Sequence, residues 1–444
     1  VGGGGGGGWG GGGGGGNNSP RPASQRAAAL VLTAAMLTTF TAPAFAGTWY
    51  IEDGDITISA GESGNNVTQN ENTTKNDTDT IITNREEGAS SHTVTIDAKD
   101  KDDKVEVTLK DVNIDTSKQS KAAVSVTGSG DTTIELDGDN ELQGGDKHAG
   151  LEHNQTVDSE GNVTSGKLTI QDDNDNAGSL TATGGYFGAG IGGGSAKAGQ
   201  VTITGGTITA ISGDGAGIGG GQGNMGSNAG NADIEISGGT IEATGGYTSA
   251  GIGGGYYGDA TIKITGDAVI KNAAGGFFGA GIGGGGGGNG DITISGNAKI
   301  ENAQGGYAGS GIGGGYGASG TVAIKDDSTV TATGGEVGAG IGGGVGGLAD
   351  ITIEGNATVN ATGGVGSAGI GGGYDAEDDD DGTGNKITIK SNESGAPTVN
   401  ATGGESSIDK KTGEKIPGGA GIGSGVGDAK ANITLEGKVT IVAK

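Results

Sequence analysis

The stretch from Gly245 to Gly285, GGYTSAGIGGGYYGDATIKITGDAVIKNAAGGFFGAGIGGG, repeats nearly the same phrase twice. Its most constant part is AGIGGG, in which one isoleucine stands among small residues. This isoleucine is Ile252 in the first copy and Ile282 in the second, 30 residues later. Further copies have their isoleucine at Ile191, Ile218, Ile312, Ile341, Ile370 and Ile422, and Val124 and Leu151 mark weaker copies upstream. A period of about 30 residues, in about ten copies, predicts a solenoid.

Each repeat contains three short pieces in which alternate residues are apolar, as expected of half-buried strands. The pairs are Ile234 and Ile236, Ile241 and Ala243, and Ala250 and Ile252. Nothing in the array repeats with a helical period. We therefore predict an all-β fold, a right-handed parallel β-helix with three strands per coil, from about Val105 to Val442. The anchor isoleucines should form a buried column, and the glycines should allow sharp bends and close approach.

Two adjacent repeats carry one additional residue. They contain IKNA and IENA where other repeats contain IxATGG, with x any residue. This predicts a one-residue bulge that brings Asn272 and Asn302 into register as a short polar ladder.

Composition limits the classes of function. The 444 residues include 108 glycines and no cysteine, and the net charge is −28. A strongly acidic chain is a poor partner for nucleic acid, whose phosphates need lysine and arginine. The lack of cysteine excludes disulfides and cysteine-ligated zinc.

The first 46 residues are typical of a leader. A glycine-rich tract precedes RPASQRAAALVLTAAMLTTFTAPAFA, which has a basic start, an apolar run and an A-x-A cleavage signal before Gly47. We predict three parts: residues 1–46 as leader and signal peptide, 47–104 as an irregular β N-terminal cap region, and 105–444 as the β-helix. The product is expected to be secreted or extracellular, either free or associated with the cell wall, with no membrane span after cleavage.

Catalytic side chains are sparse. After the leader the histidines are His92, His148 and His153, all outside the regular repeats, and the only arginine is Arg85. Acid–base chemistry on a polysaccharide needs a placed base and its partners. We expect a protein that is not an enzyme.

Aromatic residues fall in two columns. Tyr186, Tyr247, Phe277 and Tyr307 stand five residues before the anchor, and Tyr256, Tyr316 and Tyr374 stand four residues after it. In the repeat with its anchor at Ile218, the position five residues earlier is Gly213, so the first column has no ring there. Flat rings along a rigid rod can stack on sugar rings, which makes these seven residues the candidate carbohydrate site. The alternative is a ladder of rings that stack on one another and protect the coil edges.

One acidic insertion is a candidate calcium site. DAEDDDDGTG supplies six carboxylates: Asp375, Glu377, Asp378, Asp379, Asp380 and Asp381. Calcium takes oxygen ligands on flexible loops, but the spacing matches neither an EF-hand nor a nonapeptide calcium repeat. A solvated acidic loop without a metal is the alternative. No other cofactor is expected.

From Lys104 onward the sequence also resembles a known group. The phrases DTTIELDGDNELQGGDKHAGLEH, GKLTI and SLTATGGYFGAGIGGG resemble secreted or surface β-helix proteins of Gram-positive bacteria, often labelled carbohydrate-binding domain-containing proteins. The resemblance implies a β-helix and a polysaccharide or cell-surface glycan as partner.

We therefore expect an extracellular β-helix protein that binds polysaccharide at the cell surface without catalysis. One alternative is a structural or adhesin stalk without a sugar site. A second is a polysaccharide lyase or hydrolase. End-to-end self-association of rods through exposed sheet edges is also expected.

Overall fold

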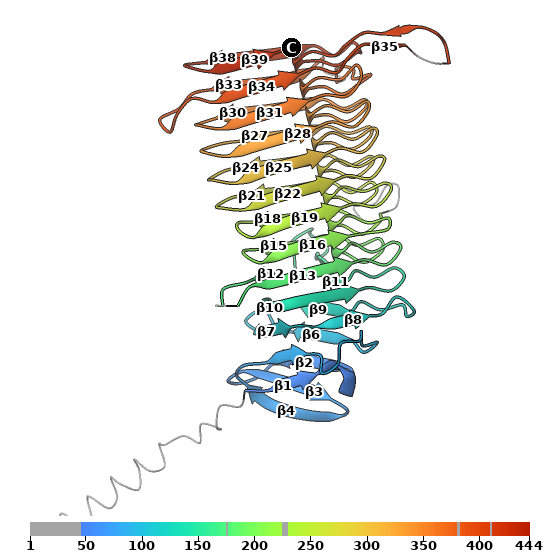
Figure 1. The fold of residues 1–444 in the computed structure, drawn as a ribbon, viewed down its shortest axis with the longest axis vertical. Coiled ribbons are helices and arrows are strands. Elements are labelled where there is room, and N and C mark those ends of the chain that lie inside the picture. The colour runs from blue at the N-terminus through green and yellow to red at the C-terminus, as the bar shows by residue number, and fades with distance from the viewer. Residues whose placement is uncertain (1–45, 175, 224–229, 380–381, 409–410) are drawn as a thin grey trace, which may run out of the picture. The chain divides into compact units, whose positions relative to one another are not determined.

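The computed structural model describes residues 46–174, 176–223, 230–379, 382–408 and 411–444. The leader predicted for residues 1–46 lies outside them, apart from Ala46. The described chain from Ala46 onward winds into about eleven stacked parallel coils, each built from one strand in each of three sheets (Figure 1). This confirms the predicted all-β solenoid. Within these ranges no helix has the length and apolar character needed to cross a bilayer.

Within a coil the chain passes through sheet B, then sheet C, then sheet A. Sheet B contains β1 (Thr48–Tyr50), β5 (Ile81–Thr83), β7 (Lys104–Lys110), β10 (Asp131–Gln143), β12 (Leu168–Gln171), β15 (Gly199–Ile203), β18 (Ala232–Ile236), β21 (Ala260–Ile264), β24 (Gly290–Ile294), β27 (Gly320–Ile324), β30 (Ala349–Glu354), β33 (Asn385–Lys390) and β38 (Ala431–Glu436). Sheet C contains β8 (Asn113–Asp115), the second half of β10, β13 (Gly178–Thr183), β16 (Thr207–Ile211), β19 (Thr240–Thr244), β22 (Val269–Ala274), β25 (Lys299–Gln304), β28 (Thr329–Thr333), β31 (Thr358–Thr362), β34 (Thr398–Thr402) and β39 (Thr440–Ala443). Sheet A contains β2 (Ile56–Ala60), β6 (Val94–Ala98), β9 (Val124–Gly128), β11 (Leu151–His153), β14 (Ile191–Gly192), β17 (Ile218–Gly219), β20 (Ile252–Gly253), β23 (Ile282–Gly283), β26 (Ile312–Gly313), β29 (Ile341–Gly342), β32 (Ile370–Gly371) and β37 (Ile422–Gly423).

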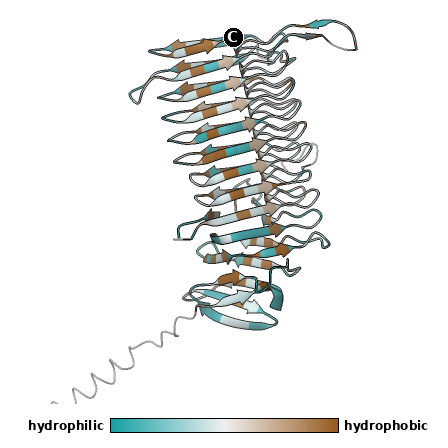
Figure 2. Ribbon diagram, viewed as in Figure 1, coloured by the Kyte–Doolittle hydropathy of each residue, from teal (hydrophilic) through white to brown (hydrophobic). Residues whose placement is uncertain are grey.

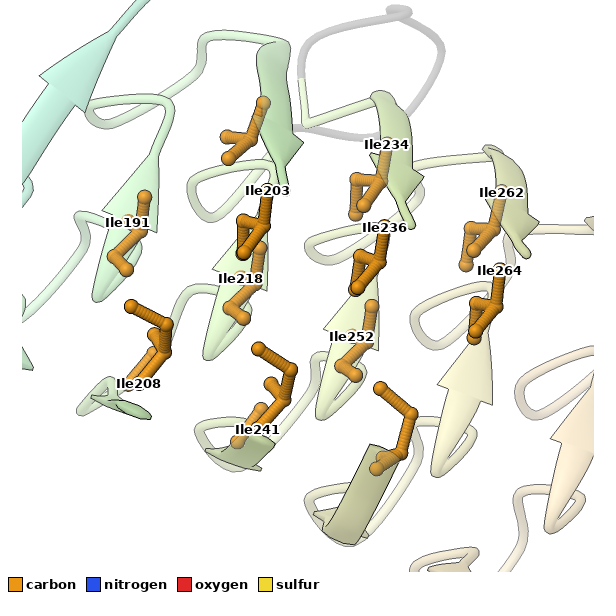
Figure 3. Packing of buried hydrophobic residues seen from close by; sticks show 14 of the residues in the cluster. Ile191, Ile203, Ile208, Ile218, Ile234, Ile236, Ile241, Ile252, Ile262 and Ile264 are labelled. Carbon is orange, nitrogen blue, oxygen red and sulfur yellow. The ribbon is translucent and has the colours of Figure 1, made fainter. Parts of the chain in front are cut away.

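The core is a set of aliphatic columns that run through the stack. Each anchor isoleucine pairs in register with its counterpart one coil on, as Ile252 does with Ile282 and Ile282 with Ile312. The three form part of one buried cluster that extends from Ile51 to Ala401. Figure 3 shows this column beside the columns from sheets B and C, and the apolar bands recur from coil to coil in Figure 2. The predicted buried column is therefore confirmed.

The AGIGGG phrase forms a narrow U-turn with the isoleucine at its inner tip. In one copy the amide of Ala280 donates to the carbonyl of Gly284 (3.0 Å), which closes the two arms around Ile282. Gly283, directly after the isoleucine, has φ +139°, and the equivalent glycine has a φ between +127° and +141° in each of the eight copies. A residue with a side chain rarely adopts such a conformation. The turn therefore needs glycine for its backbone angle and isoleucine for the core.

Other glycines are needed because neighbouring coils touch. A Cβ added at Gly306 would overlap the carbonyl oxygen of Gly276 in the preceding coil, and one added at Gly276 would overlap that of Gly246. The backbones stack here without room for a methyl group. This explains why the sequence uses so much glycine at a fixed period.

The predicted bulge is present where β22 joins the stack. Ile241 pairs with Ile270, but the next partner of the earlier strand is Asn272, so Lys271 is the additional residue. In the following coil Asn302 Nδ2 donates to Asn272 Oδ1 at 2.7 Å. The predicted asparagine ladder is confirmed.

Parallel stacking already begins in residues 47–104. The strand β1 pairs with β5 and β2 pairs with β6, both in parallel. In addition, β3 (Asn65–Gln69) and β4 (Asn72–Asp77) add to β2 as antiparallel hairpins, after a short helix η1 (Ile51–Asp53). This segment thus supplies coils of its own as well as hairpins that cover an edge of sheet A.

Candidate functional site: an aromatic cleft beside a hairpin

The two aromatic columns lie on the same side of the β-helix. They occupy the corners that flank sheet A, and because the strands of that sheet from β14 onward are only two residues long, the corners come together. The amide of Tyr316 donates to the carbonyl of Phe278 (2.8 Å), and one coil on Val345 donates to Ala308 (3.0 Å). The sequence places these columns nine residues apart, whereas the fold joins them by backbone hydrogen bonds.

Three rings of the first column stack on one another. The centroids of Tyr247 and Phe277 are 5.3 Å apart with planes 17° apart, and those of Phe277 and Tyr307 are 4.7 Å apart with planes 6° apart. Both faces of Phe277 are therefore covered by neighbouring rings. Only the outer faces at the two ends of the stack, on Tyr247 and Tyr307, can receive a sugar ring.

The outer face of Tyr307 borders a cleft of about 480 Å³. The next residues in its column are not aromatic: Glu336 and then Val365 take that position. The far wall is a hairpin inserted before the last AGIG turn, made of β35 (Ser407–Ile408) and β36 (Lys415–Ile416). The complete lining is Phe277, Phe278, Tyr307, Ala308, Tyr316, Glu336, Val337, Val345, Val365, Tyr374, Ser407, Ile408 and Ile416.

The chemistry of this cleft suits a ligand with apolar faces. Its rings and aliphatic side chains supply most of the wall, and Glu336 is the one ionisable group, apart from the tyrosines, among the described residues of the lining. Ile408 of the hairpin is 64 % exposed, which is unusual for a large aliphatic side chain. An apolar wall with a single carboxylate can hold a sugar by its C–H face and accept a hydroxyl.

The structure distributes the seven predicted sugar-binding residues unevenly. Phe277, Tyr307, Tyr316 and Tyr374 line the cleft, whereas Tyr186, Tyr247 and Tyr256 do not. Tyr256 is half-buried and its hydroxyl donates to Tyr257 Oη (3.3 Å). This hydrogen bond, together with partial burial, raises the pKa of Tyr256.

Sequence reasoning missed several members of the cleft. Phe278 contacts Phe277 edge-on and Tyr316 at 5.2 Å, and so connects the two columns. The doublet FF in GGFFGAG could have indicated it. No such feature of the sequence points to Ile408 and Ile416, because their hairpin is an insertion outside the repeat.

The acidic insertion is held to a neighbouring loop. Asp378 accepts from the backbone amide of Lys430 (2.7 Å) and pairs with its ammonium group (2.6 Å). These contacts lower the pKa of Asp378. Asp375, Glu377 and Asp379 are exposed, and Asp380 and Asp381 lie outside the described residues. In the part of the chain that the structure describes, no group of three or more histidine, aspartate or glutamate side chains is placed to hold a metal.

The histidines all have internal partners. His148 Nδ1 lies 2.8 Å from Glu152 Oε2, and His92 Nδ1 lies 3.3 Å from Asp55 Oδ1. His153 is buried and its Nδ1 donates to the carbonyl of Gln200 (2.7 Å). His148 and Glu152 share a separate groove in the N-terminal coils with Asp55 and Lys121.

Comparison with known families agrees with the architecture. Five segments match the model of a family described as Beta helix repeat: residues 176–195, 201–222, 234–256, 322–345 and 351–374. Together with the stacked coils, these matches support a parallel β-helix built from repeats. Searches of curated proteins and of solved structures found no match.

Proposed function

We propose that this β-helix protein binds polysaccharide without catalysis, outside the cell or at its surface, and that the aromatic cleft is the binding site. The observation that carries the proposal is that Tyr307 ends the ring stack and lines a cleft of about 480 Å³. The leader-like sequence of residues 1–46 supports export.

The stacking geometry sets how a sugar chain would lie. The rings of the ladder stack along the direction in which the coils are piled, so their planes lie across that direction. A sugar stacked on Tyr307 has the same orientation. A polymer therefore crosses the β-helix at the cleft instead of following the ladder along its length.

The composition of the wall favours binding over turnover. General acid–base catalysis of glycoside cleavage uses a pair of ionisable groups. Among the residues that the structure describes, the lining supplies Glu336 and contains no histidine, lysine or arginine. A single carboxylate in an apolar wall is suited to hydrogen bonding with hydroxyls.

A stalk without a sugar site is the second candidate. It is favoured by Phe277, because Tyr247 and Tyr307 stack on its two faces and leave neither for a sugar. In this function the ladder only strengthens the coil edges, and the cleft remains without a ligand.

The test is a polysaccharide array that includes cellulose, xylan, mannan and pectin, followed by calorimetry with the best ligand. Tyr307→Leu should weaken binding by about 2- to 10-fold, the effect of losing one aromatic contact. Tyr256→Leu is the matched control, since this tyrosine is on the same side but outside the lining.

Equal loss in both variants, or no binding to any polymer, would favour the stalk. If Tyr307→Leu instead lowers the melting temperature and leaves affinity unchanged, the ladder is structural. Product release from a uronic-acid polymer such as pectin would contradict the non-catalytic proposal.

A further inference from the structure

The ring ladder is interrupted at one coil. The corner between β16 and β17 has the sequence SGDGAG, where the preceding and following coils have GGYFGAG and GGYTSAG. It is one residue shorter and carries no aromatic residue. Tyr186 and Tyr247 therefore lie on either side of a level without a ring.

Contacts on both sides show that this level faces the two tyrosines. A Cβ added at Gly213 would lie 3.4–3.8 Å from atoms of Tyr186, which is ordinary contact. On the other side Gly246, next to Tyr247, lies directly over the backbone of Gly213 and Asp214. Because Tyr247 uses one face for Phe277, its other face is turned toward this level.

The spacing of the two tyrosines along the stack suits one ring between them. Two coil steps separate Tyr186 from Tyr247, or about 9.6 Å. Rings in contact have centroids about 4.5–7 Å apart, so one ring placed midway can touch both tyrosines. These tyrosines are 61 % and 56 % exposed, so both rings can be reached from solvent.

Two polar side chains belong to the coil that lacks the ring. Asp214 Oδ2 accepts from Gln222 Nε2 (3.1 Å), and burial raises the pKa of Asp214. Gln222 has the position in its coil that Tyr316 has three coils later. The backbone amide of Gln222 donates to the carbonyl of Phe187, as that of Tyr316 donates to the carbonyl of Phe278. Asp214 is buried and holds the side-chain amide of Gln222, which is only partly buried. Aromatic walls beside such an amide are a combination that recognises sugars.

We propose that the gap between Tyr186 and Tyr247 is a second glycan subsite, which takes one pyranose ring between the two tyrosines. A ring held on both faces must be apolar on both faces. This selects β-linked glucose or xylose units, whose hydroxyls are all equatorial and whose C–H bonds cover both faces. The inference rests on the proposed function for its class of ligand, but it does not require the cleft at Tyr307.

The test uses fluorine NMR on full-length protein that carries fluorotyrosine at its eight tyrosines. Signals are assigned by single Tyr→Phe substitutions, and the probe is a β-linked glucose hexamer, cellohexaose. We expect the probe to shift the signals of Tyr186 and Tyr247. Gly213→Phe should fill the gap with a ring of its own, because this glycine has no positive φ and has room for a Cβ.

In Gly213→Phe the shifts at both tyrosines should be lost while the melting temperature is kept or raised. Should this variant not fold, Tyr186→Leu serves instead, because Tyr186 is exposed and its replacement should leave the fold intact. This variant should bind cellohexaose about 2- to 10-fold more weakly, as measured from the shift of the Tyr247 signal. The inference is overturned if cellohexaose moves neither signal, if Gly213→Phe retains the shifts, or if Tyr186→Leu has no effect.

The signal of Tyr307 separates the two proposals. A shift confined to Tyr307 supports the cleft and overturns the gap. Shifts at Tyr186 and Tyr247 without one at Tyr307 support the gap and count against the cleft.

Discussion

Truncation of one anchor isoleucine tests how the stack is held together. Ile312 is fully buried and lies in register between Ile282 and Ile341. In the last repeat the anchor isoleucine is Ile422, which is only partly buried. Ile312→Ala and Ile422→Ala therefore make the same chemical change in two environments.

The expected magnitudes follow from burial. Replacing isoleucine by alanine removes three carbons, worth about 2.4 kcal/mol at about 0.8 kcal/mol each. A residual cavity in the rigid column raises the cost for Ile312 to about 3–4 kcal/mol, within the range of about 2–5 kcal/mol known for such changes. Ile422→Ala should cost about 1 kcal/mol, because its side chain already contacts water. Ile312→Asp should cost more than Ile312→Ala, since it buries an unpaired charge.

Hydrogen exchange is the suitable assay, because a repeat array can open locally. The amide of Ile282 donates to Gly311 in the affected coil. In Ile312→Ala its exchange should accelerate by about 100-fold or more if opening is local. Equal effects of the two alanine variants, or a change below about 1 kcal/mol at Ile312, would refute the buried column as the source of stability.

Two further predictions concern the acidic loop and a buried histidine. Calorimetry should detect calcium binding in the wild type and none in a variant in which Asp378 to Asp381 are replaced by asparagine. Lys430→Gln should strengthen calcium binding, because it removes the ammonium group that pairs with Asp378. Equal responses in all three proteins exclude this loop as a calcium site. Burial lowers the pKa of His153 in the folded protein. The free energy of unfolding is therefore unaffected by this histidine above about pH 6.5, the pKa in the unfolded chain. It falls as the pH drops from there toward the folded pKa, by at most about 1.36 kcal/mol per pH unit. His153→Leu should remove this part of the slope in urea denaturation at a series of pH values, and an unchanged slope contradicts the assignment.

The sequence by itself determined the architecture. A solenoid repeats its contacts, so each structural requirement recurs at the period of the coil and is visible in one chain. The isoleucine of AGIGGG marks the core, its glycine marks a backbone angle, and the additional residue before Asn272 marks the bulge. Local chemistry was sufficient because each coil contacts mainly its two neighbours.

The candidate site depended on tertiary structure in ways that periodicity does not encode. Whether Phe277 offers a face to a ligand depends on how the neighbouring rings are oriented, and Tyr247 and Tyr307 cover it on both sides. The cleft needs two corners to meet and a hairpin with Ile408 to close one end. Insertions and deletions break the repeat, and their side chains take positions that only the packed coils define. The aromatic columns and the missing ring at Gly213 were therefore visible in the sequence, whereas the cleft at Tyr307 and the ring faces left uncovered beside Gly213 were not.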